Sequence, residues 1–94
     1  MNKYEAMFII KPDLGEQDQK ALFSFIADSI AKNNGSVTNA AVWSEKRRMT
    51  FTIKKQQEGV YYLVNFTAPA DAINKLKYAY KLNETILRVM MLRV

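Results

Sequence analysis

The chain has 94 residues, the size of one domain, so we expect a single domain over residues 1–94. Hydrophobic residues make up 49% and charged residues 24%, a composition typical of globular proteins that excludes disordered and collagen-like chains. Lysine and arginine outnumber acidic residues by 14 to 9, and the net charge of +5 favours an acidic partner.

The first third of the chain predicts a strand followed by a helix. Residues 4–10 are aromatic and β-branched, which indicates a strand, and Pro12 ends it by disfavouring further pairing. Apolar residues then recur at helical spacing over residues 16–33. We expect Gly35 to end this helix in the left-handed conformation that glycine adopts easily.

The rest of the chain predicts a hairpin, a helix and a last strand. Residues 37–53 and 60–68 have strand propensity and are separated by the polar turn 54–59. Residues 69–81 open with proline and carry apolar residues on one helical face, which predicts a second helix. Residues 86–94 are again strand-like. The order predicts an α+β, ferredoxin-like split βαβ fold, with two helices on one face of a four-stranded antiparallel sheet.

Two helices can cover only one face of this sheet, yet both faces are apolar. Strand alternation places Phe8 on one side of the first strand and Met7 on the other. We therefore expect the uncovered face to expose an apolar patch, which monomers seldom leave open. We interpret it as a protein-partner face, with a homodimer or a tolerated surface as alternatives, and we expect Ile9→Asp to leave the fold intact. Its members are Met7, Ile9, Tyr61, Leu63, Met90 and Leu92.

Cysteine and histidine are both absent. This excludes disulfides, thiol nucleophiles, the usual catalytic base and the common zinc and haem ligands. The three glycines are too far apart to form a phosphate-binding loop. We therefore expect no enzyme activity, no metal, no cofactor and no small-molecule substrate. The lack of cysteine favours the cytoplasm, and with no apolar run near 18 residues we expect no membrane partner.

The excess positive charge lies in the later two-thirds of the chain. Residues 1–34 carry four basic and five acidic groups, whereas residues 35–60 and 61–94 each carry five basic and two acidic groups. Phosphate contacts are the functional interpretation and a solvated face is the alternative. Neighbouring strand residues point to opposite faces unless a bulge intervenes, so Arg47 and Arg48 share a surface only across a bulge. The candidates for RNA contact are Arg47, Arg48, Lys54 and Lys55 on the hairpin, and Arg88 and Arg93 on the last strand.

An ordered set of short segments resembles the bacterial small-subunit ribosomal protein six family over essentially the whole chain. These segments are Tyr4-Glu5, residues 11–14, Trp43, residues 47–53, Ala68-Pro69, Asn83-Glu84 and residues 86–90. The resemblance implies a ferredoxin-like, non-catalytic protein of the small ribosomal subunit. It further implies binding to the central domain of the small-subunit ribosomal RNA together with small-subunit ribosomal protein eighteen.

The resemblance also carries residues over to RNA contact. Arg47, Arg48 and Arg88 match the family's arginines, and Lys3 and Tyr4 match its basic-aromatic start. The chain departs from the pattern at Ser44-Glu45, where a glycine usually follows the tryptophan, at Thr52, which replaces a common proline, and in lacking the usual tail after Val94. The alternative function is a free-standing dimeric ferredoxin-like domain that has a regulatory role or binds a small anion.

Overall fold

The computed structural model describes the backbone of residues 1–53 and 56–94, and the side chains of residues 1–42 and 59–94. Six elements follow one another in the predicted order. The helices match the prediction closely, and the strands of the hairpin are longer than predicted at the turn. The elements are β1 (Asn2–Ile10), α1 (Glu16–Lys32), β2 (Ser36–Ile53), β3 (Gln56–Ala68), α2 (Ala72–Lys81) and β4 (Ile86–Arg93).

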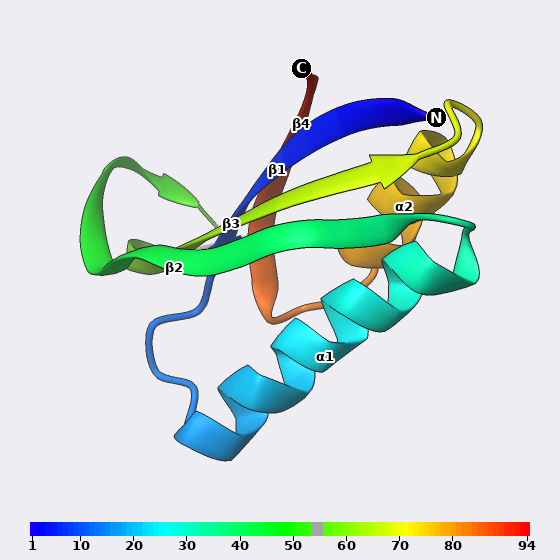
Figure 1. Ribbon diagram of the computed structural model, residues 1–94. Helices are drawn as coiled ribbons and strands as arrows, with labels where there is room; N and C mark the ends of the chain where they lie inside the picture. Colours follow the sequence, from blue (N-terminus) through cyan, green and yellow to red (C-terminus); the bar gives the residue numbers. More distant parts are fainter. Residues whose placement is uncertain (54–55) are drawn as a thin grey trace.

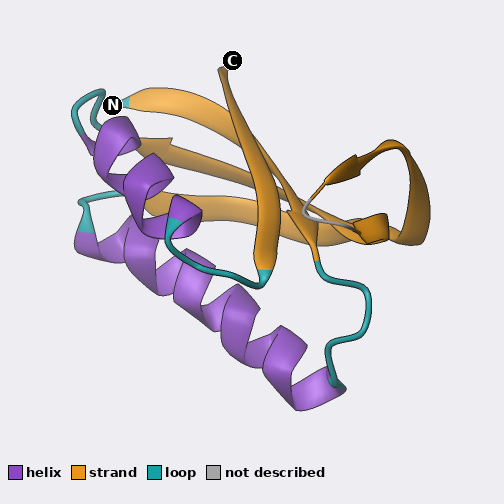
Figure 2. Cartoon of the chain, turned by 180° about the vertical axis from the view of Figure 1, so that it is seen from behind, coloured by secondary structure: helices purple, strands orange, loops and turns teal. Residues whose placement is uncertain are grey.

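The four strands form one antiparallel sheet in the order β2-β3-β1-β4. As predicted, β1 and β3 are central, and β2 and β4 are the two edges. Both helices lie on the same side of the sheet (Figure 1), and the view from behind leaves the opposite face without a helix (Figure 2). The arrangement is the ferredoxin-like βαββαβ fold.

The core lies between this sheet and the two helices. Phe8 on β1 is fully buried, and its ring meets that of Tyr80 on α2 edge to face, with the centroids 5.0 Å apart. The alternate residues Ala6 and Ile10 on β1 belong to the same cluster as Ile26 of α1. Strand alternation therefore assigned the helix-covered face correctly, and the odd-numbered residues of β1 belong to the other face.

The connection from α1 to β2 differs from the prediction at Gly35. The left-handed conformation belongs to Asn34, with φ of 66°, and no described glycine has a positive φ. Gly35 is needed for space instead, because a Cβ there would lie 2.7 Å from the Ile30 side chain and 2.7 Å from the Thr67 carbonyl oxygen. The glycine thus allows the chain to pass closely between α1 and the end of β3.

Tyr80 joins the two helices inside the core. Its hydroxyl donates a hydrogen bond to the Ile26 carbonyl oxygen over 2.9 Å. Burial disfavours the charged phenolate and raises the pKa of Tyr80 well above its ordinary value. The folded chain therefore keeps this phenol protonated at a pH that ionises it in the unfolded chain.

We expect the free energy of unfolding to fall as the pH rises above about 10, the ordinary tyrosine value, because only the unfolded chain then releases the Tyr80 proton. The slope for one such group approaches about 1.4 kcal/mol per pH unit. Tyr80→Phe should cost about 1 kcal/mol at neutral pH by removing the hydrogen bond, but it should weaken this alkaline fall. Urea unfolding of both proteins at about pH 8 and about pH 11 measures the difference. An identical alkaline fall in the variant would contradict this assignment.

Candidate nucleic-acid and protein interface

The face of the sheet opposite the helices, here called the open face, carries the predicted partner residues. The strand register sets Met7 directly opposite Leu63 on one side and Met90 on the other. Farther along the strands it sets Ile9 opposite Tyr61, and Leu92 follows Met90 on the same side of β4. The structure thus brings all six predicted partner-face residues together on three adjacent strands.

Most of this patch is accessible. Met90 is 43% exposed and Leu92 is 66% exposed, while Met7, Tyr61 and Leu63 are half-buried. The two helices do not cover these side chains, because both helices lie on the other face (Figure 2). An apolar surface therefore crosses the centre of the open face.

Ile9 does not fit the expectation of exposure. It is only 5% exposed, and it forms a small separate cluster with Leu87 and Tyr61. The cause is a shift in the β1–β4 register: Ile9 pairs with Arg88 but Ile10 pairs with Ile86, which leaves Leu87 as an extra residue. Leu87 packs against Ile9, so the expectation that Ile9→Asp leaves the fold intact is wrong.

The two arginines of β4 do not share a surface. Arg88 is exposed and pairs with Ile9, which places it on the open face. Arg93 pairs with Tyr4 on the helix side of the sheet, and its Nη2 donates to the Asn2 side-chain oxygen over 3.0 Å. Arg88 therefore borders the apolar patch, whereas Arg93 lies on the opposite face at the far end of β4.

The start of β1 places one of its two candidate residues at the surface. Lys3 is exposed on the open face, opposite Thr67, and lines a hollow of about 250 Å³. The Tyr4 ring is 8% exposed and stacks on Phe66 with centroids 5.5 Å apart, so it is a core residue. Its hydroxyl accepts a hydrogen bond from the Asn2 amide over 3.1 Å. Packing thus leaves the Tyr4 ring unable to stack on a base, which corrects the expected aromatic contact.

The basic hairpin is described only in its backbone. The register sets Arg47 opposite Gly59 and Arg48 opposite Glu58, and it shifts between Ser44 and Arg47, which is a bulge beside the Ser44-Glu45 departure. The side chains of both arginines lie outside the described residues. Lys54 and Lys55 lie outside them entirely. Contacts of these four residues with RNA stay predictions.

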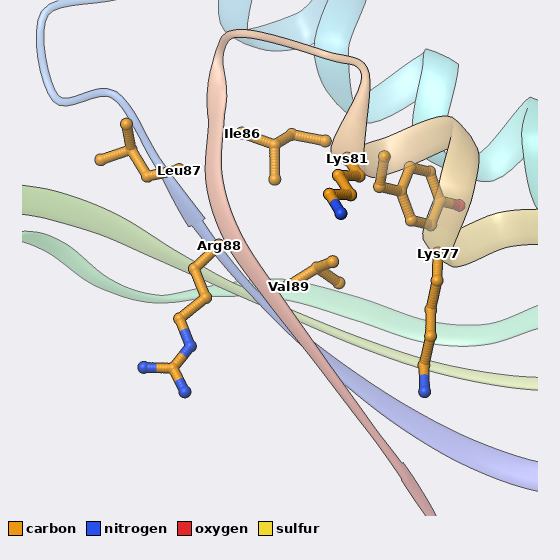
Figure 3. A pocket seen from close by; sticks show the side chains of 7 residues that line it. Lys77, Lys81, Ile86, Leu87, Arg88 and Val89 are labelled. Atoms are coloured by element: carbon orange, nitrogen blue, oxygen red, sulfur yellow. The ribbon is translucent and has the colours of Figure 1, made fainter. Parts of the chain in front are cut away.

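A second group of cations, which the sequence reasoning did not select, lies between α2 and β4. Lys77 and Lys81 of α2 line a groove of about 370 Å³ together with Arg88 (Figure 3). Their spacing of four residues on a predicted helix was the available signal, since residues four apart share one helix face. The adjacent arginines and lysines of the hairpin gave a stronger local signal, and the prediction followed them instead.

Two further findings concern the described residues. They contain no group of three or more acidic, histidine or cysteine side chains arranged to hold a metal ion. Among them, neither α1 nor α2 has the length and apolar character needed to cross a bilayer.

Comparison with known proteins gives concordant matches over nearly the whole chain. The family model described as ribosomal protein S6 matches residues 3–93. Small ribosomal subunit protein bS6 of Thermoanaerobacter pseudethanolicus is 36% identical over 93 residues, covering 99% of this chain and 97% of that protein. The bS6 protein of Lactobacillus acidophilus is 40% identical over 93 residues, covering 98% and 94%. The crystal structure of 30S ribosomal protein S6 from Thermotoga maritima superposes with a TM-score of 0.90 at 26% identity, covering 99% of this chain and 87% of that one.

Proposed function

Because this chain belongs to the ribosomal protein S6 family, we propose that it binds the central domain of the small-subunit ribosomal RNA together with small-subunit ribosomal protein eighteen. The chain is a ribosomal protein of the small subunit and not an enzyme. Its place of work is the ribosome in the cytoplasm, and its role needs no cofactor.

The uncovered apolar patch is the observation that carries the partner half of the proposal. Met7, Leu63 and Met90 lie side by side across three strands, with Leu92 more exposed beyond them. Covering such side chains with another protein removes apolar surface from water, at roughly 25 cal/mol for each Å² buried. Arg88 lies on the same face beside the patch, so one partner can cover the patch while RNA is held at its margin.

The RNA half rests on charge. Among the described residues, the aromatic side chain on the open face is Tyr61, which is half-buried and packs against Ile9 and Leu87. Stacking on bases is therefore a minor contribution, and the cations act mainly on phosphates. With a net charge of only +5, the chain alone holds RNA weakly. A partner that adds its own cations raises the affinity.

The experiment for the partner face replaces Met90 with aspartate. We expect at least a tenfold loss in affinity for protein eighteen, about 1.4 kcal/mol, because a charge then enters an apolar interface. Unfolding stability should change by less than about 1 kcal/mol, since Met90 is 43% exposed. Titration of the labelled partner and urea unfolding measure the two quantities.

Leu82→Asp is the matched control, because Leu82 is a 65% exposed apolar residue at the end of α2, away from the open face. It should leave the partner affinity unchanged. Equal affinity of the Met90→Asp variant and the original chain would contradict the proposed partner face. A stable dimer of this chain that Met90→Asp dissociates, with no binding of protein eighteen, would support the alternative of a free-standing dimeric domain.

A further inference from the structure

A groove of about 370 Å³ runs between α2 and the outer edge of β4. Two cations, Lys77 and Lys81, lie one helical turn apart on the α2 side, and Arg88 extends from β4 in a direction away from them (Figure 3). Cations therefore lie on both sides of the edge strand. The floor between them is apolar and consists of Tyr80, Ile86, Leu87 and Val89.

This combination of walls and charges favours an anion. None of the described residues that line the groove is acidic, so the charged groups at its rim have one sign. An apolar wall beside charges of one sign focuses their field and raises the local concentration of counter-ions. Lysine stems also pack along apolar surface while their amines stay in water, which places the charges of Lys77 and Lys81 at the rim.

The edge of β4 adds a backbone donor. The Val94 amide donates to the Lys3 carbonyl oxygen over 2.9 Å, so this residue faces β1. Because backbone groups alternate along a strand, the amide of Val89 points the other way, out of the sheet. In the described sheet no strand lies beyond β4. The Val89 N–H is therefore available beside the groove as a further donor to an anion.

We propose that this groove is a second phosphate contact, at which the RNA backbone crosses the outer edge of β4 from Arg88 on the open face to Lys77 and Lys81 on the helix side. The inference rests on the proposed function, because it extends the RNA contact of that same protein. Arg88 links the two surfaces, since it borders the apolar patch and also lines the groove.

A purely structural role or a different occupant accounts for fewer of these cations. A lysine in the last turn stabilises the negative end of a helix, and this explains Lys81 but neither Lys77 nor Arg88. A second copy of this chain is a poor occupant, because β4 carries Arg88 and Arg93 and no acidic residue, so two such edges would oppose like charges. An acidic segment of a protein partner is the competing occupant that the experiment must separate from RNA.

The test is the variant Lys77→Ala/Lys81→Ala, with affinity for a central-domain fragment of small-subunit ribosomal RNA measured over a range of salt in the presence of protein eighteen. We expect weaker binding and a slope of log affinity against log salt that flattens by about 0.7–0.9 for each lysine that binds a phosphate in the original chain. Alanine favours helix, so the fold should persist. Lys20→Ala/Lys32→Ala on α1 removes the same charge from exposed positions outside the groove and should leave the slope nearly unchanged.

Each outcome separates the inference from the proposed function. Normal RNA binding by the original chain with an unchanged slope in the Lys77→Ala/Lys81→Ala variant overturns the groove contact and leaves the proposed function standing. Weaker binding of the variant to protein eighteen alone, with the RNA slope unchanged, assigns the groove to an acidic protein segment and also overturns the inference. No binding of the RNA fragment by the original chain with its partner overturns the proposed function itself, and the inference with it.

Discussion

Replacing Ile9 with alanine should lower the free energy of unfolding by about 2–3 kcal/mol, the low end of the range for emptied cores. Ile9 is 5% exposed although it points away from the helices, because Leu87 and Tyr61 pack over it. Alanine leaves a cavity beneath Leu87 that the small cluster can only partly fill. Urea unfolding measures the decrease.

Met90→Ala is the matched control for this prediction. Met90 lies on the same face but is 43% exposed, so its truncation should cost less than about 1 kcal/mol. If Ile9→Ala cost no more than Met90→Ala, then Leu87 would not cover Ile9 in solution. The open face would in that case be as fully exposed as strand alternation alone predicts.

Replacing both Arg47 and Arg48 with alanine should weaken binding to the ribosomal RNA complex at all sequences alike. Each arginine that holds a phosphate contributes about 0.7–0.9 to the slope of log affinity against log salt, so the slope should flatten by that amount for each such arginine removed. Arginine suits this role because its planar fork gives a phosphate two parallel hydrogen bonds. Filter binding of labelled RNA over a salt series measures the slope.

The size of the change reports how many of the two arginines reach phosphate. The backbone pairs Arg47 with Gly59 and Arg48 with Glu58 in direct succession, with the bulge before them and no register shift between them. Alternation then predicts opposite faces, so a change worth two phosphates would mean that RNA reaches both sides of the hairpin. The variant Arg47→Lys/Arg48→Lys keeps the charge and should retain the slope while reducing the affinity in part.

An unchanged slope in the alanine variant would contradict a phosphate role for this pair. The hairpin arginines would then be a solvated edge. The remaining candidates from the sequence would be Lys3, Lys54, Lys55, Arg88 and Arg93.

The sequence was sufficient to predict the elements and their order because the patterns are local. The alternation in β1 assigned Phe8 to the core, and the helical spacing of Leu22, Ile26 and Ile30 identified the buried face of α1. Both signals depend only on the period of the backbone, which a single segment carries within itself. The predicted sheet order followed once the element order was known.

The features that were predicted wrongly depend on contacts between distant segments. Ile9 is buried because β4 places Leu87 over it, and no pattern within β1 records that register shift. The role of Gly35 depends on how closely the chain passes Ile30 and Thr67. Tyr4 resembles a surface aromatic from its place near the terminus, yet Phe66 on β3 completes its packing.

The candidate site was predicted in part for the same reason. The open face follows from strand alternation, and the structure brings its six residues together. The groove of Lys77, Lys81 and Arg88 requires α2 to pack beside the edge strand β4, and only the tertiary structure shows this arrangement.

The central claim is that a protein partner on the open face and RNA act together. The most direct test measures the affinity of this chain for the central-domain RNA fragment with and without saturating protein eighteen at one fixed salt concentration. We predict at least tenfold tighter binding with the partner, a coupling of about 1.4 kcal/mol. Equal affinity in the two measurements would contradict the claim, because the apolar open face would then have no part in RNA binding.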